Sequence, residues 1–276
     1  MLTSAIAAIP SETALLFLLA LLISAAGFYR VVYFVSVGYA FSIAGMAVAA
    51  GWIFRDHLDL AVIAQCALLA TYGLRLGGYI LKREGSAAYR RELLDNQERG
   101  RGVKLITKLL IWPGVSLLYV LMFSPCLLNL VTVRSDGGEG LWSLPFGLGV
   151  MALGLTLEAT ADLQKSAYKR DNPARFCDTG LYRLVRCPNY LGEIVFWVGQ
   201  WLAGLAALAH WVHWTASLIG LVCIVLIMMG STKRLEGKQG ERYGDDPEYQ
   251  KYSSTVPVLF PFVPVYTLKN IRVYLE

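Results

Sequence analysis

Long stretches without any charged residue recur along this chain. Six such stretches contain no Asp, Glu, Lys or Arg and cover Thr13–Tyr29, Val31–Phe54, Leu60–Leu74, Leu109–Val133, Gly140–Leu157 and Ile194–Thr232. A helix needs roughly 20 predominantly apolar residues to cross a hydrocarbon core about 30 Å thick. Most of the stretches meet that length, so the pattern predicts an all-α integral membrane protein.

The last of these stretches is too long for a single crossing. Its 39 residues would form a helix of about 58 Å at 1.5 Å per residue, which is nearly twice the thickness of the core. The chain must therefore turn back. We expect the turn at residues 209–214 (AHWVHW), because imidazole and indole rings suit the headgroup level.

With that turn, the chain forms one membrane domain, residues 1–276, with seven predicted transmembrane helices. They are expected at about residues 13–29, 31–54, 58–81, 107–131, 140–160, 190–209 and 212–230. The first segment lacks a basic leader and an obvious cleavage site, so we interpret it as a retained span and not as a signal peptide.

The distribution of basic residues tests this count independently, because cytoplasmic loops collect Lys and Arg. With the N-terminus outside, Arg30 and the inner segments 82–104, 161–189 and 233–276 hold 21 of the 25 basic residues. A single crossing at 194–232 would put the basic tail on the wrong side. We therefore expect an outside N-terminus, a cytoplasmic C-terminus and a site at the cytoplasmic face.

Composition narrows the class of protein further. The chain is 56% hydrophobic and 16% charged, whereas soluble domains have about 45–50% apolar and about 25% charged residues. Intrinsic disorder and a disulfide scaffold are thereby excluded, and no nucleic-acid partner is expected. The concentration of basic residues at the cytoplasmic side has two explanations. These residues either orient the protein in the membrane and contact lipid headgroups, or they bind an anionic ligand.

Histidine placement argues against a metal centre at the cytoplasmic side. His57, His210 and His213 all fall in the predicted external loops, and the last two form only a weak metal pair. Neither a Gly-x-Gly-x-x-Gly fingerprint nor a Walker loop occurs. We therefore expect no metal, and any nucleotide would be held by helix ends and loops.

Polar side chains share one face of the predicted third span. They recur at helical spacing as Gln65, Tyr72, Arg75, Tyr79 and Lys82. Ionisable groups inside a membrane are costly and are candidates for function. Arg75 lies about two turns from the cytoplasmic end, where it either has a partner or snorkels toward the interface.

Two further polar faces lie on the fifth and sixth predicted spans. The first comprises Glu158, Asp162 and Lys165, and the second comprises Asn189, Glu193, Trp197 and Gln200. The first face is either a solvated helix end or a set of acceptors for a ligand's hydroxyls. Glu193 is the most informative single residue, because a carboxylate directly before 39 uncharged residues has few structural explanations.

The tail after the last span contains two kinds of segment. Residues 241–252 mix charge with aromatic rings, which suits a short amphipathic helix against the cytoplasmic mouth. The apolar segment Val256–Val265 is interrupted by prolines and is too short to span, so we expect it to pack under the bundle.

One run of residues resembles a known family signature. Residues 178–193 (DTGLYRLVRCPNYLGE) are similar to the Gly-Leu-Trp/Tyr-Arg and Arg-His-Pro-Asn-Tyr-x-Gly-Glu elements of the steroid 5α-reductase C-terminal family, and sterol C14 and C7 reductases carry a close relative of them. Less specific matches extend the resemblance over about residues 65–262: Tyr72-x-x-Arg75, Lys233-Arg234-x-Glu236, Arg242-Tyr243-Gly244, Tyr249-x-x-Tyr252 and Phe260-Pro261-Phe262.

The resemblance implies a monomeric enzyme with seven transmembrane helices that uses NADPH to reduce the C4=C5 double bond of 3-oxo-Δ4 steroids or of a related enone lipid. A bacterial homologue would lie in the inner membrane with a cytoplasmic active site, and a eukaryotic one in the endoplasmic reticulum. Tyr72, at the steroid carbonyl, and Glu193 would be the catalytic residues. The implied cofactor-binding residues are Arg75, Asp162, Arg170, Arg175, Arg183, Asn189, Glu193, Lys233, Arg234 and Tyr249.

Within that set, Asn189 and Glu193 are expected near the nicotinamide, and the ribose and phosphates near Asp162, Arg170, Arg175, Lys233 and Arg234. Two departures from the signature matter. Cys187 stands where the wider group has His, and residues 31–54 contain no carboxylate that could pair with Tyr72. Tyr72 is therefore expected to act with Tyr33, Tyr39 or water.

Two other functions remain open from the sequence. A membrane methyltransferase of the isoprenylcysteine or phospholipid type resembles the same Arg-x-Pro-x-Tyr-x-Gly segment and would use S-adenosylmethionine. S-adenosylmethionine lacks phosphates, so it would not explain the basic residues, which would then serve only to orient the protein in the membrane. A non-catalytic sterol-binding protein that retains the fold is the third possibility.

Overall fold

The computed structural model describes residues 2–85 and 102–270. The described residues form helices and no strand. The chain divides into two compact units, the first with residues 1–148 and 201–220 and the second with residues 149–200 and 221–276. Four basic residues of the predicted inner segment 82–104 lie outside the described residues, namely Arg90, Arg91, Arg99 and Arg101.

Five helical segments of the described residues are long and apolar enough to cross a membrane. They are Val31–Ile53, Leu60–Glu84, Leu105–Asp136, Ser143–Asp171 and Trp211–Tyr243, and they correspond to five of the seven predicted spans. Of the other two predictions, Glu12–Phe28 is a shorter apolar helix and Pro188–Gly204 has 17 residues. The long apolar helices indicate a membrane protein.

The 39-residue uncharged stretch is interrupted as predicted, but the interruption lies at residues 205–210, before most of the predicted turn at 209–214. Helix α8 (Pro188–Gly204) is followed by the short 3-10 helix η5 (Leu205–Ala207). Helix α9 (Trp211–Tyr243) then begins within the predicted turn.

Two helices continue beyond their predicted ends. Helix α7 (Ser143–Asp171) was expected to end near residue 160, and α9 near residue 230. Hydropathy marks where the apolar stretch ends, whereas the helix goes on as long as its polar residues have helical propensity and packing partners. In α7 this extension buries Ala161 against Cys177 and Tyr182.

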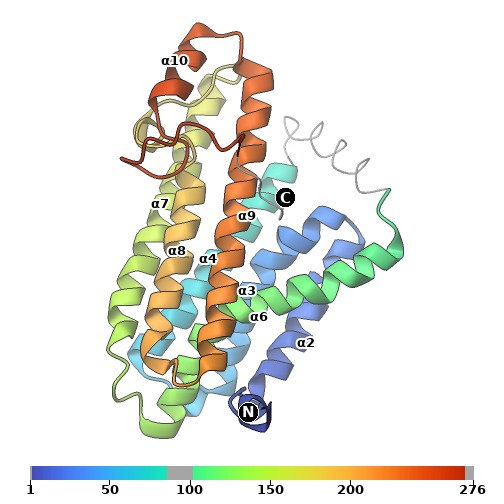
Figure 1. Cartoon of the computed structure of the whole chain (residues 1–276), viewed down its shortest axis with the longest axis vertical. Coiled ribbons are helices and arrows are strands. Elements are labelled where there is room, and N and C mark those ends of the chain that lie inside the picture. The colour runs from blue at the N-terminus through green and yellow to red at the C-terminus, as the bar shows by residue number, and fades with distance from the viewer. Residues whose placement is uncertain (1, 86–101, 271–276) are drawn as a thin grey trace. The chain divides into compact units, whose positions relative to one another are not determined.

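The first unit is built around consecutive helices near the N-terminus. It contains α1 (Leu2–Ala7), α2 (Glu12–Ser24), η1 (Ala25–Phe28), η2 (Val31–Val35), α3 (Val37–Ile53), η3 (Arg55–His57), α4 (Leu60–Glu84), α6 (Leu105–Asp136) and η5, with the adjoining parts of α7, α8 and α9. Helix α3 packs against α2, α4 and α6, and these helices are labelled in Figure 1.

Helices α3 and α4 approach each other closely at Gly73. A Cβ atom added there would lie 2.3 Å from the carbonyl oxygen of Ala40 and 2.9 Å from the backbone nitrogen of Ala44. Only glycine permits this backbone contact. The residues that precede Gly73 and Ala40 in sequence are Tyr72 and Tyr39, so the close approach brings these two side chains together.

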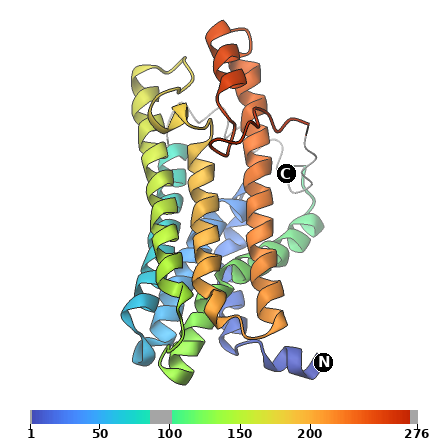
Figure 2. The same ribbon diagram turned by 60° about the vertical axis from the view of Figure 1, so that its left-hand side comes forward.

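The second unit contains the rest of α7, α8 and α9, together with η4 (Gly180–Arg183) and α10 (Pro247–Thr255). Its three long helical segments run side by side in both views (Figures 1 and 2). Helix α10 overlaps the second half of the predicted amphipathic region and continues three residues beyond it, whereas residues 241–243 belong to α9. Asp246 caps α10 by accepting a hydrogen bond from the backbone nitrogen of Glu248 at 2.8 Å.

The prediction for the apolar tail segment Val256–Val265 is correct in its first half only. Val258 and Leu259 are buried, whereas Phe260, Phe262 and Val263 are exposed. The tail is joined to the residues before α8 by backbone hydrogen bonds, from Arg186 to the carbonyl of Pro257 at 2.9 Å and from Cys187 to the carbonyl of Val258 at 3.1 Å.

Candidate functional site

Glycines on α7 and α8 bring the two helix backbones into contact. A Cβ atom at Gly192 would lie 2.6 Å from the backbone nitrogen of Glu158, and one at Gly154 would lie 2.3 Å from the backbone nitrogen of Phe196. No side chain fits at these distances. The glycine of the Leu191-Gly192-Glu193 run therefore sets the position of Glu193 against the α7 segment that carries Glu158.

Three carboxylates are buried in these helices. Glu158 and Asp162 lie on α7 and Glu193 lies on α8, and all three are almost fully buried. Each one has interaction partners within the protein, as a charge removed from water requires. The helical spacing in the sequence predicted the shared face of Glu158 and Asp162, and burial shows that this face is not a solvated helix end.

The residues before α8 form a buried ionic cluster that we call the Arg186 clasp. The Arg186 side chain is 2% exposed, and its Nη2 lies 3.3 Å from Oε1 of Glu236 on α9. The same nitrogen donates to the backbone carbonyl of Tyr266. The other oxygen of Glu236 accepts a hydrogen bond from the backbone nitrogen of Leu268 at 3.0 Å. The clasp thus joins α8, α9 and the C-terminal tail.

Two buried polar atoms at the start of α8 have no hydrogen-bond partner among the described residues. One is the donor Nε of Arg186, and the other is the acceptor Oδ1 of Asn189. An unsatisfied buried polar group costs about 1–3 kcal/mol. A bound group that brings both an acceptor and a donor would satisfy both atoms, and a carboxamide is such a group.

Cys187, which replaces the histidine of the signature, cannot serve as a base or nucleophile at neutral pH. Its side chain is 2% exposed, and burial raises the pKa of the Cys187 thiol to about 11. The thiol therefore stays protonated and acts as a small buried side chain.

Most of the basic residues proposed for the phosphates are exposed. Arg170, Arg183 and Arg234 are exposed, whereas Lys233 is half-buried. Arg170 lies 3.5 Å from the neighbouring Asp171. The exposed guanidinium groups of Arg170, Arg183 and Arg234 can be reached by an anion from solvent.

Arg175 is already committed to partners in the protein. Its guanidinium lies 3.1 Å from Asp178 and 2.9 Å from Glu248, so it ties the loop after α7 to α10. The hydrogen bond that Arg175 donates to Asp178 and the charges of both carboxylates raise the pKa of Arg175. A phosphate would have to displace these carboxylates, which makes Arg175 the weakest of the predicted phosphate ligands.

Tyr249 belongs to an aromatic cluster. Its ring centroid lies 5.2 Å from that of Phe176 and 5.7 Å from that of Tyr243, and Tyr252 stacks on Phe176 at 5.2 Å. Burial raises the pKa of the Tyr249 and Tyr252 phenols. These rings hold α10 against the loop after α7 and the end of α9, and Tyr249 also interacts with the guanidinium of Arg186.

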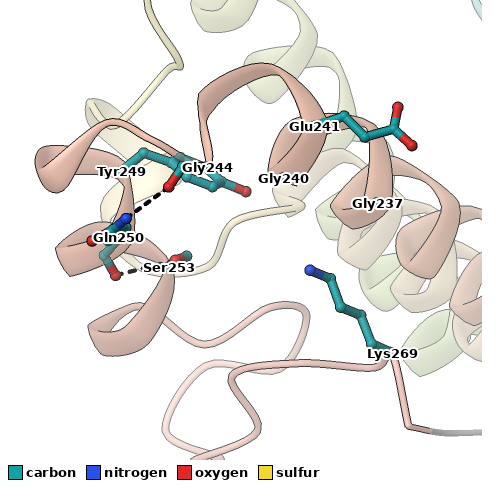
Figure 3. A pocket seen from close by; sticks show the side chains of 8 residues that line it. All are labelled: Gly237, Gly240, Glu241, Gly244, Tyr249, Gln250, Ser253 and Lys269. Carbon is teal, nitrogen blue, oxygen red and sulfur yellow. Dashed lines mark hydrogen bonds between the residues drawn. The ribbon is translucent and has the colours of Figure 1, made fainter.

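A cavity of 580 Å³ opens between the C-terminal turns of α9, helix α10 and the tail (Figure 3). Its volume falls within the roughly 300–1,000 Å³ of small-molecule sites. It is lined by Gly237, Gly240, Glu241, Gly244, Tyr249, Gln250, Ser253 and Lys269. Gln250 donates to the carbonyl of Gly244 at 2.8 Å, and Lys269 extends its ammonium toward Gly240. Of the predicted site residues, Tyr249 alone lines this cavity.

In the first unit, Tyr72 is fully buried on α4, and its hydroxyl lies 2.8 Å from the hydroxyl of Tyr39 on α3. Of the three partners left open by the sequence, Tyr39 is the one observed. Tyr33 instead donates to Glu84 at 2.5 Å. We call Tyr39 and Tyr72 the tyrosine pair.

The other polar residues on the Tyr72 face of α4 have different environments. Gln65 is buried and accepts a hydrogen bond from Asn129 at 2.9 Å, so its role is structural. Arg75 is half-buried and has interactions within the protein. Lys82 is exposed. The predicted face therefore runs from the buried core to the end of the helix.

Sequence reasoning missed the pairing of Arg186 with Glu236. Both residues stand in the quoted motifs, but they are 50 positions apart, and neither spacing nor hydropathy links them. The one usable signal was Arg186 itself, a charged residue two positions before the start of the apolar helix α8.

Comparisons with known proteins identify a family but no named relative. The model of a family described as "protein of unknown function (DUF1295)" matches residues 21–256. No curated protein and no solved structure matches the chain.

Proposed function

The chain belongs to the DUF1295 family, and from the motif at the start of α8 we propose that it is an NADPH-dependent membrane reductase. The proposed reaction is reduction of the C4=C5 double bond of 3-oxo-Δ4 steroids or of a related enone lipid. The observation that carries the proposal is the pair of unsatisfied buried atoms on Arg186 and Asn189, within a motif that resembles that of steroid 5α-reductases.

The residues at the start of α8 fit the nicotinamide end of NADPH. Its carboxamide offers one acceptor and two donor hydrogens, which match the Nε of Arg186 and the Oδ1 of Asn189. The buried carboxylates Asp162 and Glu193 are suited to accept hydrogen bonds from ribose hydroxyls or from the carboxamide. Their burial excludes water, which strengthens each such bond.

The exposed basic residues suit the anionic end of the cofactor. Arg170, Arg183 and Arg234 are the candidates, with Lys233 beside them, because guanidinium groups bind phosphate through charge-assisted, often bidentate hydrogen bonds. One of these side chains would bind the 2′-phosphate that distinguishes NADPH from NADH.

When bound, NADPH supplies a hydride to C5 of the enone. Negative charge then develops on the 3-oxo oxygen, and a phenol of the tyrosine pair can stabilise it by donating a hydrogen bond. The hydrogen bond with Tyr39 orients the Tyr72 hydroxyl. A proton taken up at C4 completes the reduction.

We also propose seven crossings, with the N-terminus outside and the C-terminus in the cytoplasm. Besides the five long helices, Glu12–Phe28 and Pro188–Gly204 are apolar. The 17 residues of α8 make a helix of about 26 Å, close to the lower limit for a span. The bias of basic residues toward the proposed inner segments supports this orientation.

Ligand binding to purified protein in nanodiscs tests the proposal. We expect NADPH to raise the melting temperature more than NADH does, and S-adenosylmethionine to have no effect. With progesterone or testosterone added, NADPH absorbance should fall and the product should carry hydrogen at C5 in the α configuration. Stabilisation by S-adenosylmethionine alone would replace the reductase by the methyltransferase, and no response to any ligand would favour a sterol-binding protein.

A matched pair of asparagine variants locates the cofactor. Asn189→Ala should abolish stabilisation by NADPH, whereas Asn172→Ala should retain it, because the Asn172 side chain is exposed and donates to the nearby backbone carbonyl of Tyr168. Equal NADPH affinity in the two variants would remove the start of α8 from the cofactor site.

A further inference from the structure

The tail carries an apolar loop that no packing within the described residues covers. We call residues 260–266 (FPFVPVY) the Phe262 loop. Its exposed side chains are those of Phe260, Phe262, Val263, Val265 and Tyr266, and Phe262 is 96% exposed. Contiguous exposed apolar side chains of this kind mark an interaction surface.

The base of the Phe262 loop is fixed. The backbone nitrogen of Val258 donates to the carbonyl of Val265 at 2.9 Å, and Arg186 holds the carbonyl of Tyr266. Val258 and Leu259, which lead into the loop, are buried. The exposed side chains are therefore presented from an anchored base.

The backbone at the tip of the loop is strained. Phe262 has a φ of 65°, and it is the one non-glycine residue with positive φ in the described part of the chain. The left-handed region is unfavourable for a bulky residue, and glycine would adopt it without penalty. A phenylalanine here gains nothing from internal packing, which points to a contact outside the chain.

The loop is attached close to the points where the uncharged stretches of α8 and α9 end. Leu268 contacts Glu236, and Glu236 follows the last uncharged residue of the α9 span, Thr232, by four positions. That separation is roughly 6 Å along the helix, whereas the headgroup layer of one leaflet is roughly 5–7 Å thick. The other attachment, at Arg186 and Cys187, lies directly before α8 enters its apolar stretch.

We propose that the Phe262 loop inserts its apolar side chains into the boundary between headgroups and acyl chains of the membrane that α9 crosses. This boundary accepts aromatic and aliphatic side chains from amphipathic surface elements. We assign lipid as the occupant because hydrogen bonds attach the base of the loop beside the start of α8 and beside Glu236 on α9, where the uncharged stretches of both helices end. The proposal does not depend on the reductase activity.

Spin labelling at Val263 tests this placement. Val263→Cys and the control Ser254→Cys, an exposed polar position on α10, are each labelled with a nitroxide in vesicles of phosphatidylethanolamine, phosphatidylglycerol and cardiolipin. Labelled wild-type protein corrects for the five native cysteines, four of which are buried. We expect the label at Val263 to collide several-fold more with oxygen and several-fold less with a water-soluble nickel chelate than the label at Ser254.

Two other outcomes would overturn the proposal. Nickel collisions equal to those at Ser254 would place the loop in water. Protection of the Val263 label from both reagents would show that a protein surface, such as a second copy of the chain, covers the loop.

A pair of tip variants provides a second test. In the Val263→Cys background, Phe262→Leu should keep the labelled position in lipid, whereas Phe262→Asp should move it to the aqueous phase and raise nickel collisions several-fold. Unchanged collisions in the aspartate variant would show that Phe262 does not hold the loop in the membrane.

Discussion

The Arg186 clasp and the tyrosine pair satisfy buried polar groups in opposite ways. The clasp joins two full charges through an ion pair at 3.3 Å and draws its remaining partners from the tail, about 80 residues away in sequence. The tyrosine pair joins two neutral hydroxyls at 2.8 Å on consecutive helices. Neutral groups can be satisfied by one neighbour, whereas buried charges require several.

This difference predicts where each region is vulnerable. Losing one partner of the clasp leaves a buried charge, so the cost falls on stability. Losing one hydroxyl of the tyrosine pair leaves a neutral group and removes a hydrogen bond, which typically contributes about 0.5–1.5 kcal/mol to stability. We therefore expect the tyrosine variants to act on turnover and the clasp variants to act on folding.

The largest effect is expected from Arg186→Met. Breaking a buried ion pair by removing one partner typically costs 3–5 kcal/mol of unfolding free energy, and here it strands Glu236. Unfolding in mild detergent measures the loss. The double variant with Glu236→Leu removes both charges and should recover more than half of it; if the double variant is no more stable than the single one, the ion pair does not account for the cost.

The next effect concerns the tyrosine pair. Under the proposed function, Tyr72→Phe should lower turnover by 10²–10³, as removal of one oxyanion donor does, with NADPH affinity unchanged. Tyr39→Phe should lower it about tenfold, because Tyr39 only orients Tyr72. The control is Tyr119→Phe, which removes a buried hydroxyl bonded to the carbonyl of Phe34. Equal turnover in all three variants would exclude the pair from the reaction.

The pH dependence of stability should report the burial of Cys187. Its pKa rises from 9.0 to about 11 on folding, so the folded state holds this proton more tightly than the unfolded state. The stabilisation is complete below pH 9 and is lost as the pH rises toward 11, a change of about 2–3 kcal/mol. Between those pH values, the free energy of unfolding of the wild type should fall by this amount relative to that of Cys187→Ala. If the free energies of both proteins change equally with pH, the prediction is wrong.

The smallest of these effects on stability is expected at the contact between α7 and α8. Gly192→Ala forces a Cβ atom to 2.6 Å from the backbone of Glu158, and overpacking of this kind costs about 1–3 kcal/mol. Gly149→Ala is the matched control on α7, because nothing lies within 4 Å of its added Cβ. We expect it to keep or raise the melting temperature. If both variants lose the same stability, helix contact is not the cause.

The sequence predicted the apolar helices, a break after α8 and the shared face of Glu158 and Asp162, but it left open whether that face was buried. These features depend on local composition and on helical spacing, which a single sequence displays. The extensions of α7 and α9 were missed, because polar helical residues carry no hydropathy signal. The choice of Tyr39 over Tyr33 depends on the contact of Gly73 with Ala40, and no pattern in the sequence marks that contact.

The tail was the least predictable part. Val258 and Leu259 pack as expected, but the exposure of Phe262 follows from two attachments that are distant in sequence, at Arg186 and at Glu236. Apolar composition alone suggested burial for the whole segment. A hydrophobic residue can instead be held outward when its neighbours are anchored.

The Arg186 clasp also sets an order of events during synthesis. Arg186 is synthesised just before α8. The carbonyl of Tyr266, which accepts its hydrogen bond, and the amide of Leu268, which donates to Glu236, emerge from the ribosome about 80 residues later. Until then the guanidinium has to remain hydrated at the bilayer surface, which delays the seating of α8. Biogenesis of this half of the molecule therefore finishes after translation has passed the tail, and a ribosome-stalled chain that lacks it should expose α8 to proteases.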